Sequence, residues 1–205
     1  MSLNNTVLND NVKVQFFECT SYEQLCANNA WLEGLIDCYR SVFKESWGED
    51  YTYSEVNERL QSELAGNACL RFVLDISNNK VLAFCWAQFL DAEGVKQAIQ
   101  SIHYVHTISE FSVEDAVPVH NGSIYIHDIG VLESYRGQVS LGLLLLPVLE
   151  VVSQRAGSRR LMFWSIKETC IAHLAEKINI QAYYEKGDVQ FYSGLLPTDY
   201  GVEVS

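Results

Sequence analysis

The sequence predicts an α/β fold of the mixed α+β type, with a central, mostly antiparallel sheet that carries helices on both faces. Three observations predict it. Short β-branched and aromatic runs alternate with longer segments whose apolar residues recur at helical spacing. Two of the runs are joined by a turn containing Asn78-Asn79, which is typical of an antiparallel hairpin. A later strand, a long aliphatic helix and a further strand follow in an order that indicates a right-handed parallel crossover.

The first half of the chain opens on a polar segment, residues 1–11. It lacks a basic stretch followed by an apolar one, so we expect a flexible arm rather than a signal or transit peptide, with residues 12–205 as a single domain. Ser21 is a plausible N-cap, and Gly34 weakens the helix that follows. The expected elements are a strand at 12–17, helices at 21–43 and 54–65, and strands at 69–76 and 81–90.

The second half begins with an excursion of about 30 residues, which is long for a connection and indicates a lid or a wall over the acceptor site. Pro147 lies inside the long helix, so a kink or a delayed start is expected there. The expected elements are a helix at 95–108, a loop at 111–121, a strand at 123–131, helices at 138–156 and 167–177 around a strand at 160–166, and a hairpin of 180–186 with 189–193.

Composition narrows the class of partner. The chain has 205 residues and a formal net charge of −12, which argues against nucleic acid and mildly favours a cationic acceptor such as an amine; solubility is the alternative role of this charge. No run of about 18 apolar residues occurs, so no membrane span is predicted. The six cysteines show neither metal-ligand nor redox spacing, which indicates reduced core thiols in a cytoplasmic protein.

The most informative segment runs from Ile124 to Gln138. An apolar strand ends at Gly130-Val131, a short polar turn closes on Tyr135-Arg136-Gly137, and the long aliphatic helix begins. This order directs backbone N–H groups and the positive end of a helix towards one point. Such a point suits a phosphate or a diphosphate. A solvated arginine in a plain turn is the alternative reading of Arg136-Gly137.

The segment Asp128-Ile-Gly-Val-Leu-Glu-Ser-Tyr-Arg-Gly-Gln138, together with the order of elements over residues 12–194, resembles the GNAT superfamily of acetyl-CoA-dependent N-acyltransferases. The resemblance implies a GNAT-like fold and acetyl-CoA (coenzyme A) as the cofactor. It also implies an N-acetyltransferase that acts by direct attack of a primary amine of a small molecule or peptide. A catalytically inactive GNAT-like binding or interaction module is the alternative. A homodimer is compatible with either reading.

Cofactor contacts follow from the resemblance residue by residue. Backbone groups of Ile129 and Val131 would face the pantetheine arm, and the Val131 N–H would also bind the carbonyl oxygen. The amides that would face the diphosphate are those of Arg136, Gly137 and Gln138. Gly142 would stand for the third glycine of the family pattern, whereas Val139 replaces the second.

The candidate general bases are His127 and Asp128, which strand alternation places on opposite faces. Histidine titrates near neutral pH, whereas an aspartate needs a raised pKa or a relay through water. A hydrogen bond to a neighbouring loop is the alternative role for either residue, and Glu133 is a third candidate. The resemblance makes Tyr184, with Tyr183 second, the donor to the leaving thiolate; a sheet aromatic is the alternative.

The resemblance places the acceptor groove at the first two helices, where the segment after the first long helix falls. Aromatic and acidic side chains there suit an amine, and contact between two helices is the alternative for the aromatic ones. The residues concerned are Phe43, Trp47, Glu49, Asp50 and Tyr51. His103 and His106 have helical spacing but no third ligand, so no metal site is predicted.

Overall fold

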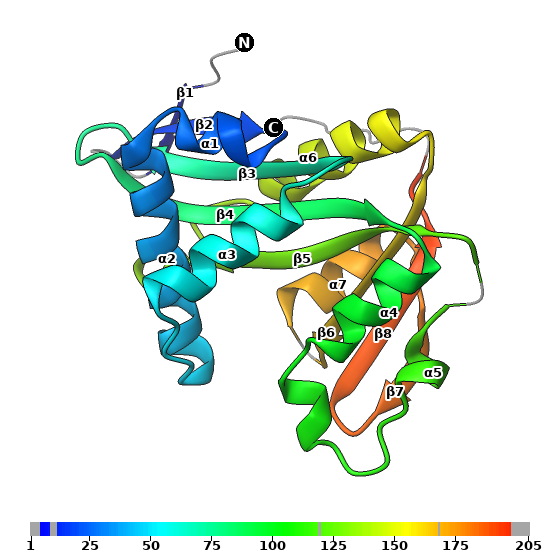
Figure 1. Ribbon diagram of the computed structural model, residues 1–205. Coiled ribbons are helices and arrows are strands. Elements are labelled where there is room, and N and C mark those ends of the chain that lie inside the picture. The colour runs from blue at the N-terminus through cyan, green and yellow to red at the C-terminus, as the bar shows by residue number, and fades with distance from the viewer. Residues whose placement is uncertain (1–4, 9–11, 119, 168, 198–205) are drawn as a thin grey trace. The chain divides into compact units, whose positions relative to one another are not determined.

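The computed structural model describes residues 5–8, 12–118, 120–167 and 169–197 (Figure 1). Contacts within the chain group it into two compact units. The first comprises Met1–Gln88 and His127–Arg155, and the second comprises Phe89–Ile126 and Ala156–Ser205.

The sheet of the first unit has the strand order β1-β2-β3-β4-β5. Its strands are β1 (Asn5–Leu8), β2 (Val12–Cys19), β3 (Ala68–Asp75), β4 (Lys80–Leu90) and the second half of β5 (Ser123–Val131). β2 pairs antiparallel with β3, and β3 with β4 through the hairpin predicted at Asn78-Asn79. Asn79 takes the left-handed conformation at φ 52°, which asparagine tolerates well.

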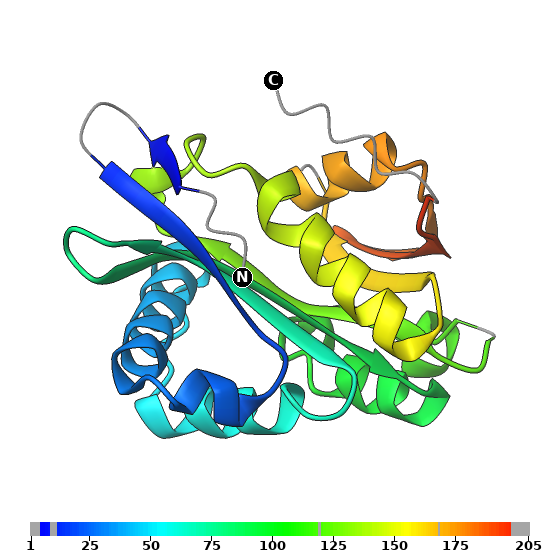
Figure 2. The same ribbon diagram turned by 90° about the horizontal axis from the view of Figure 1, so that it is seen from above.

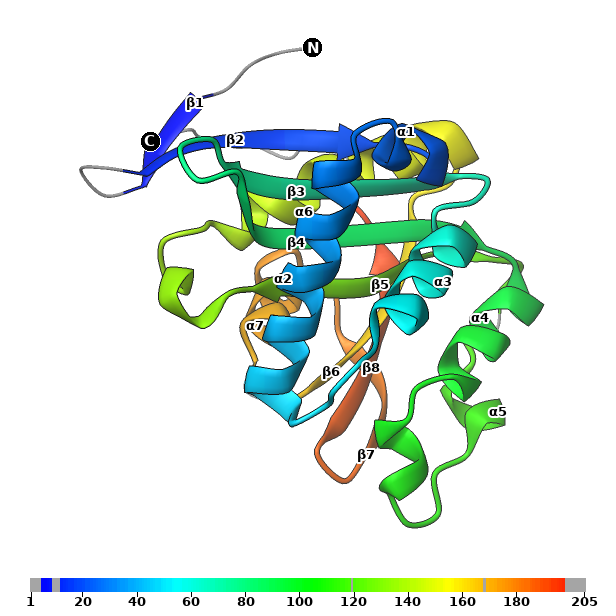
Figure 3. The same ribbon diagram turned by 60° about the vertical axis from the view of Figure 1, so that its left-hand side comes forward.

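Helices cover both faces of this sheet. α1 (Tyr22–Cys26), α2 (Asn29–Trp47) and α3 (Tyr53–Glu63) lie on one face, and α6 (Leu141–Ala156) lies on the other (Figure 2). α2 crosses the strands (Figure 3), and it buries Leu35, Ile36 and Tyr39. The apolar face of the helix thereby meets the sheet, which is where most of its stabilisation arises.

The N-terminal elements differ in detail from the sequence prediction. Part of the segment expected to be a flexible arm pairs with β2 as the edge strand β1, because Asn5–Leu8 provides an unbroken antiparallel register; residues 1–4 and 9–11 lie outside the described part. The helix expected at 21–43 is two helices. The break falls at Asn28, whose side chain caps α2, and not at Gly34. α3 begins after Thr52, which forms a capping box with Glu55, and not after Ser54.

The second unit has the strand order β5-β6-β8-β7. β5 pairs parallel with β6 (Arg160–Ile166) at Ile124 and Tyr125, as predicted for the crossover. β8 (Val189–Leu195) pairs antiparallel with both β6 and β7 (Ala182–Lys186). Its helices are α4 (Ala92–Gln100), a 3-10 turn (Tyr104–Thr107), α5 (Val113–Ala116) and α7 (Cys170–Lys177).

The segment between β4 and β5 contains more short helices than the sequence predicts. The helix expected at 95–108 starts earlier, because Asp91 caps α4, and it ends at Gln100. A short α5 replaces part of the loop expected at 111–121, of which residue 119 lies outside the described part. Val95 and Ile99 anchor α4 in a core that includes Tyr125 and Phe191. The chain thus folds this excursion onto the sheet of its own unit.

The fold class predicted from the sequence is confirmed: a mixed, mostly antiparallel sheet flanked by helices. Within the described ranges, no helix combines the length and the apolar character that crossing a membrane requires. Cysteines of the described part are free thiols, and four of them are buried: Cys19, Cys38, Cys69 and Cys85. The side chain of Cys170 lies outside the described part.

Candidate active site

The second half of β5 passes directly beneath α2, and Gly130 makes this possible. A Cβ atom at Gly130 would lie 2.5 Å from Phe84 Cζ and 2.9 Å from Val42 Cγ1. No side chain fits at such distances without moving its neighbours. The glycine of the Asp128-Ile-Gly-Val131 motif is therefore a packing requirement in this chain: it lets the strand lie close to Phe84 and α2.

The loop that follows β5 folds back on itself. Leu132 N–H donates to Leu82 O on β4 (3.0 Å), and a 3-10 turn covers Glu133–Tyr135. Arg136 N–H donates to Glu133 O (3.2 Å) and Gln138 N–H to Tyr135 O (3.1 Å). In this conformation, two of the three amides predicted to face a diphosphate are donors within the loop. The prediction for Arg136 and Gln138 therefore requires the loop to rearrange.

The start of α6 offers other amides. The helix begins at Leu141 and not at Gln138, and Ser140 Oγ accepts a hydrogen bond from Leu143 N–H (3.4 Å). Helix geometry leaves the amides of Leu141 and Gly142 without an acceptor inside the helix. Gly137 has φ 79° and open space where a Cβ would lie. Backbone donors thus remain at Gly137 and at the helix start, among residues 137–142.

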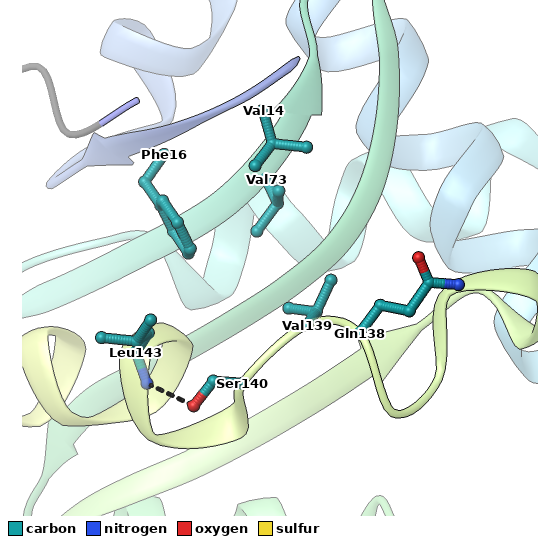
Figure 4. Close-up of a pocket in the computed structure, with 7 residues that line it drawn as sticks. All are labelled: Val14, Phe16, Val73, Gln138, Val139, Ser140 and Leu143. Atoms are coloured by element: carbon teal, nitrogen blue, oxygen red, sulfur yellow. Dashed lines mark hydrogen bonds between the residues drawn. The ribbon is translucent and has the colours of Figure 1, made fainter. Parts of the chain in front are cut away.

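Val139 does not obstruct this loop. Its side chain is buried and faces a small cavity of about 50 Å³ between α6 and the sheet. Val14, Phe16 and Val73 of β2 and β3 line the opposite wall, with Leu143 beside Val139 (Figure 4). The residue that replaces the second glycine of the family pattern is therefore an apolar anchor that holds the loop against the sheet.

Two hydrogen bonds tie the loop to the end of α2, and a third ties it to the end of β5. Arg136 Nη2 donates to Ser46 Oγ (2.9 Å) and Arg136 Nε to Val131 O (3.3 Å). Glu133 N–H donates to Glu45 Oε2 (3.4 Å). The Arg136 side chain therefore bridges β5 and α2 and is not simply a solvated group in a turn.

A cluster of charged side chains lies between α3 and β5. Arg59 pairs with Asp128 (Nη2 to Oδ2, 2.9 Å) and with Glu63 (Nε to Oε1, 2.9 Å). Glu63 Oε2 also lies 3.3 Å from His127 Nδ1 and accepts a hydrogen bond from Trp86 Nε1. His127 and Asp128 thus reach the same helix, so the prediction that they face opposite sides of the sheet is wrong; regular alternation does not hold at this pair.

Burial sets the protonation of this charge cluster. Desolvation raises the pKa of Asp128 to about 7; the negative charge of Glu63 adds to the rise and Arg59 opposes it. Burial also acts to raise the pKa of Glu63, but His127, Arg59 and the Trp86 N–H stabilise its ionised form and lower that pKa to about 2. Two carboxyl groups close together therefore differ in protonation near neutral pH, a pattern common at catalytic sites.

Aromatic rings surround the charge cluster on the side of α2. Tyr39 donates to Asp128 Oδ2 (3.5 Å) and accepts from Arg59 Nη1 (3.0 Å). Phe43 stacks on Tyr39 with ring centroids 4.3 Å apart, and Tyr51 meets Phe43 edge to face. Phe43 and Tyr51, two residues of the predicted acceptor groove, therefore pack on Tyr39, the phenol that donates to Asp128; their role in binding an acceptor stays a prediction.

The other predicted acceptor residues lie further towards solvent. The side chain of Trp47 is 40% exposed at the end of α2. Glu49 Oε2 accepts a hydrogen bond from the Tyr51 hydroxyl (2.9 Å), whereas Asp50 pairs with Lys44 at the surface. Of these two acids, Glu49 is therefore the one that the Tyr51 hydroxyl holds beside the aromatic rings.

Tyr184 belongs to the second unit, where it lies on β7. Its hydroxyl accepts a hydrogen bond from Ser112 N–H (3.4 Å), and its ring packs edge to face on Phe111 and Phe191. The stretch around it is a strand pair, as one of the two readings of the sequence anticipates. Its neighbour Tyr183 donates to Ala116 O. A catalytic role for Tyr184 stays a prediction.

The histidines at 103 and 106 do not share a helix. His103 precedes the 3-10 turn, and His106 Nε2 lies 2.7 Å from Gln100 O. Searching the described residues finds no three His, Cys, Asp or Glu side chains placed to hold one metal ion.

Sequence reasoning missed three members of the charge cluster: Tyr39, Arg59 and Glu63. Arg59 and Glu63 are four residues apart on α3, a spacing that places them on one helix face. That signal is present in the sequence, but it also describes many solvated surface pairs. Only the antiparallel packing of the strands brings α3 to β5.

Comparison with known structures identifies the fold. No protein-family model matches the chain, and no curated protein matches its sequence. The GNAT domain of S. lividans PAT is similar over 95% of this chain and 97% of its own, with 13% identity and a TM-score of 0.61. The polyamine N-acetyltransferase of Drosophila melanogaster covers 88% of this chain and 100% of its own, at 13% identity and a TM-score of 0.57. A putative phosphinothricin N-acetyltransferase covers 89% and 99%, at 14% identity and a TM-score of 0.55. The resemblance predicted from residues 128–138 is thereby confirmed at the level of architecture: the chain has the GNAT fold.

Proposed function

We propose that the chain is an N-acetyltransferase that moves an acetyl group from acetyl-CoA to a primary amine of a small molecule or peptide. The observation that carries the proposal is the largely buried carboxyl group of Asp128 on β5, which Arg59 and Tyr39 hold in place; burial raises its pKa to about 7. It lies three residues before Val131 and the loop whose sequence resembles the GNAT cofactor loop. A base with a pKa near the working pH is the group that amine acylation requires.

The residues present fit a diphosphate at the start of α6. The amides of Leu141 and Gly142 lie in the first turn of a 16-residue helix, where its dipole favours an anion. Gly137 adds a position with open space around it. When bound, acetyl-CoA would supply an activated thioester. Backbone groups of Ile129 and Val131 would bind the pantetheine arm.

Groups of the protein would carry out the other steps of the transfer. Asp128, with a side chain that is 12% exposed, would accept the amine proton directly or through one water molecule. Arg59 and Tyr39 hold its carboxylate in place. Because Leu132 N–H donates towards β4, the preceding Val131 N–H points away from β4, as the donor to the carbonyl oxygen must. His127 and Glu63 complete the cluster; His127 is the second candidate base.

A cationic amine is the acceptor class that the surroundings favour. Phe43 and Tyr51 present aromatic rings, and Glu49 adds a carboxylate beside them. The net charge of −12 would also attract a cation. Proteins of this fold act on different amines, since the Drosophila protein is named for polyamines and another for phosphinothricin.

The alternative is a GNAT-like module that binds a partner without turnover. It is favoured by a specific observation: the amides of Arg136 and Gln138 already donate within the loop. Binding of acetyl-CoA without transfer would distinguish this module from the enzyme.

Calorimetry with acetyl-CoA and a thiol-release assay test the proposal together. We expect saturable binding, and thiol release with at least one member of a panel of diamines, polyamines and peptides with free α-amines. No binding would contradict the proposal. Binding without thiol release across the panel would support the module.

A variant at the helix start sharpens the test. Gly142→Asp places a negative charge where it favours the helix but repels a diphosphate, and the position has room because the nearest atom, Ser140 Oγ, would lie 3.7 Å from the added Cβ. We expect binding weaker by about tenfold or more, with the fold retained. The matched control is Gln154→Asp, which adds the same charge near the other end of α6 and should bind like the wild type.

A further inference from the structure

The second unit has a hollow of its own, of about 550 Å³, near the starts of β5 and β6. Its volume is in the range of small-molecule sites. The hollow is lined by Phe89, His120, Asn121, Gly122, Ser158 and Arg160. None of these residues belongs to the site of the proposed acetyl transfer, so the inference does not rest on that function.

Arg160 is the charged group of this hollow. Across the described part of the chain, every other arginine guanidinium donates to a protein oxygen, as the contacts of Arg40, Arg59, Arg71, Arg136, Arg155 and Arg159 show. No such contact of the Arg160 guanidinium occurs among the described residues. The Arg160 side chain is half-buried in a chain whose 26 acidic residues outnumber its 14 basic ones, so its guanidinium is available to a ligand in the hollow.

The groups around Arg160 are hydrogen-bond donors. Ser158 Oγ accepts a hydrogen bond from Arg160 N–H (3.3 Å), so its own proton remains available for a ligand. Asn121 adds a side-chain amide, and the described residues that line the hollow include no acidic side chain. A cation with hydroxyl and amide donors beside it is the arrangement that binds carboxylates and phosphates.

The walls of the hollow are fixed by contacts of their own. His120 is held on both ring nitrogens, by Ser193 Oγ (3.1 Å) and Ser123 Oγ (3.4 Å). Burial and the nearby charge of Arg160 lower the pKa of His120, which keeps the ring neutral near pH 7. A Cβ at Gly122 would lie 2.8 Å from Phe89 Cζ and 2.8 Å from Leu90 O, so only glycine lets the chain pass the Phe89 ring this closely.

We propose that this hollow binds a small oxyanion, a carboxylate or phosphate group, at Arg160, with the apolar part of the same molecule packed on Phe89. The anion supplies the partner that no described residue of the chain gives the Arg160 guanidinium. The aromatic wall supplies apolar contact without a charge of its own. The hollow is therefore a second ligand site, formed by residues 89, 120–122, 158 and 160.

The imidazole of His120 reports on occupancy. Its NMR resonance, assigned by its loss in His120→Gln, is followed against pH at constant ionic strength, with inorganic phosphate, acetate or benzoate added. We expect an oxyanion to raise the pKa of His120 saturably, because it offsets the charge of Arg160. Benzoate should bind several-fold more tightly than acetate if the ring meets Phe89, and Phe89→Leu should reduce that preference.

Two variants decide the outcome. Arg160→Gln should abolish the anion-dependent shift, whereas Lys96→Gln, which removes one positive charge elsewhere in the same unit, should leave it unchanged. A preference for phosphate over both carboxylates would identify phosphate esters as the ligand class, and the reverse would identify carboxylates. The proposal is overturned if none of the three anions gives a saturable shift, or if Arg160→Gln responds as the wild type does.

Discussion

Arg59 and Arg160 show how differently the two units treat a half-buried cation. Arg59 bonds to two carboxylates and a phenol within the first unit. Arg160 lines an open hollow in the second unit and is bonded to no acidic side chain that the structure describes. Both sit beside a histidine, but only the first histidine is paired with an acid, Glu63.

The difference indicates two uses of charge. Where a cation is matched inside the chain, its partners acquire unusual protonation, as Asp128 and Glu63 do. Where it is unmatched, the chain leaves room for an anion from solution. The first arrangement suits proton transfer, and the second suits binding.

Among the substitutions that test this difference, removing Arg59 should lower the free energy of unfolding most. Arg59→Gln leaves Asp128 and Glu63 without their cation, and we expect a loss of about 2–3 kcal/mol in the free energy of unfolding. The expected loss is smaller than that for a fully buried ion pair because the Arg59 side chain is 32% exposed. Urea denaturation at pH 8 measures it, with Arg59→Lys as the control that keeps the charge.

The stability lost in Arg59→Gln should increase with pH. Because the folded-state pKa of Asp128 is raised to about 7, and losing Arg59 raises it further, the ionised carboxylate is what the substitution leaves unbalanced. The destabilisation should therefore be largest above pH 7 and shrink as pH falls and Asp128 becomes protonated. A pH-independent loss would show that Arg59 acts through packing alone.

Gly130→Ala should have the next largest effect, and on the first unit only. The added Cβ would lie 2.5 Å from Phe84 Cζ, so the ring or the strand must shift. We expect a loss of about 1–2 kcal/mol of stability, measured by thermal and urea unfolding. Combining it with Phe84→Leu should recover part of the loss. The pKa of His120 should be the same as in the wild type, and a change there would contradict the separation of the two sites.

Arg160→Gln should have the smallest effect on stability, within about 0.5 kcal/mol, because Arg160 forms no ion pair with any residue that the structure describes. It should also raise the pKa of His120, since the charge that lowers it is gone. Urea denaturation and the NMR titration measure the two quantities on the same sample. A loss as large as that of Arg59→Gln would show that Arg160 has an internal partner.

The sequence predicts the elements near the site well. β5 and β6 have the predicted bounds, because their apolar runs are closed by clear turn residues. The helix capped by Asn28 and the early start of α4 were missed, since Asn and Asp occur in many turns and cap only where the chain folds back. The first residue of a helix therefore depends on whether a nearby Asn or Asp side chain caps the helix or forms a turn.

The candidate site was predicted in part. The motif at residues 128–138 identifies the strand and loop, whereas the acceptor role of Phe43, which stacks on the Asp128 partner Tyr39, stays a prediction. The pairing of Asp128 with Arg59 crosses 69 positions of sequence (128 minus 59) and depends on the packing of α3 on the sheet. The internal hydrogen bonds of Arg136 and Gln138 also depend on the local turn, which no residue pattern specifies.

The protonation of Asp128 is the most direct test of the proposed chemistry. The rate of thiol release from acetyl-CoA with the best amine of the panel should rise with pH through about 7 and level off above it, because the ionised carboxylate is the base. Asp128→Asn should retain acetyl-CoA binding, lose most of the rate and lose this rise. An unchanged profile in Asp128→Asn would contradict the proposed role of Asp128, as would a carbon-13 titration that places its carboxyl at the ordinary value for aspartate.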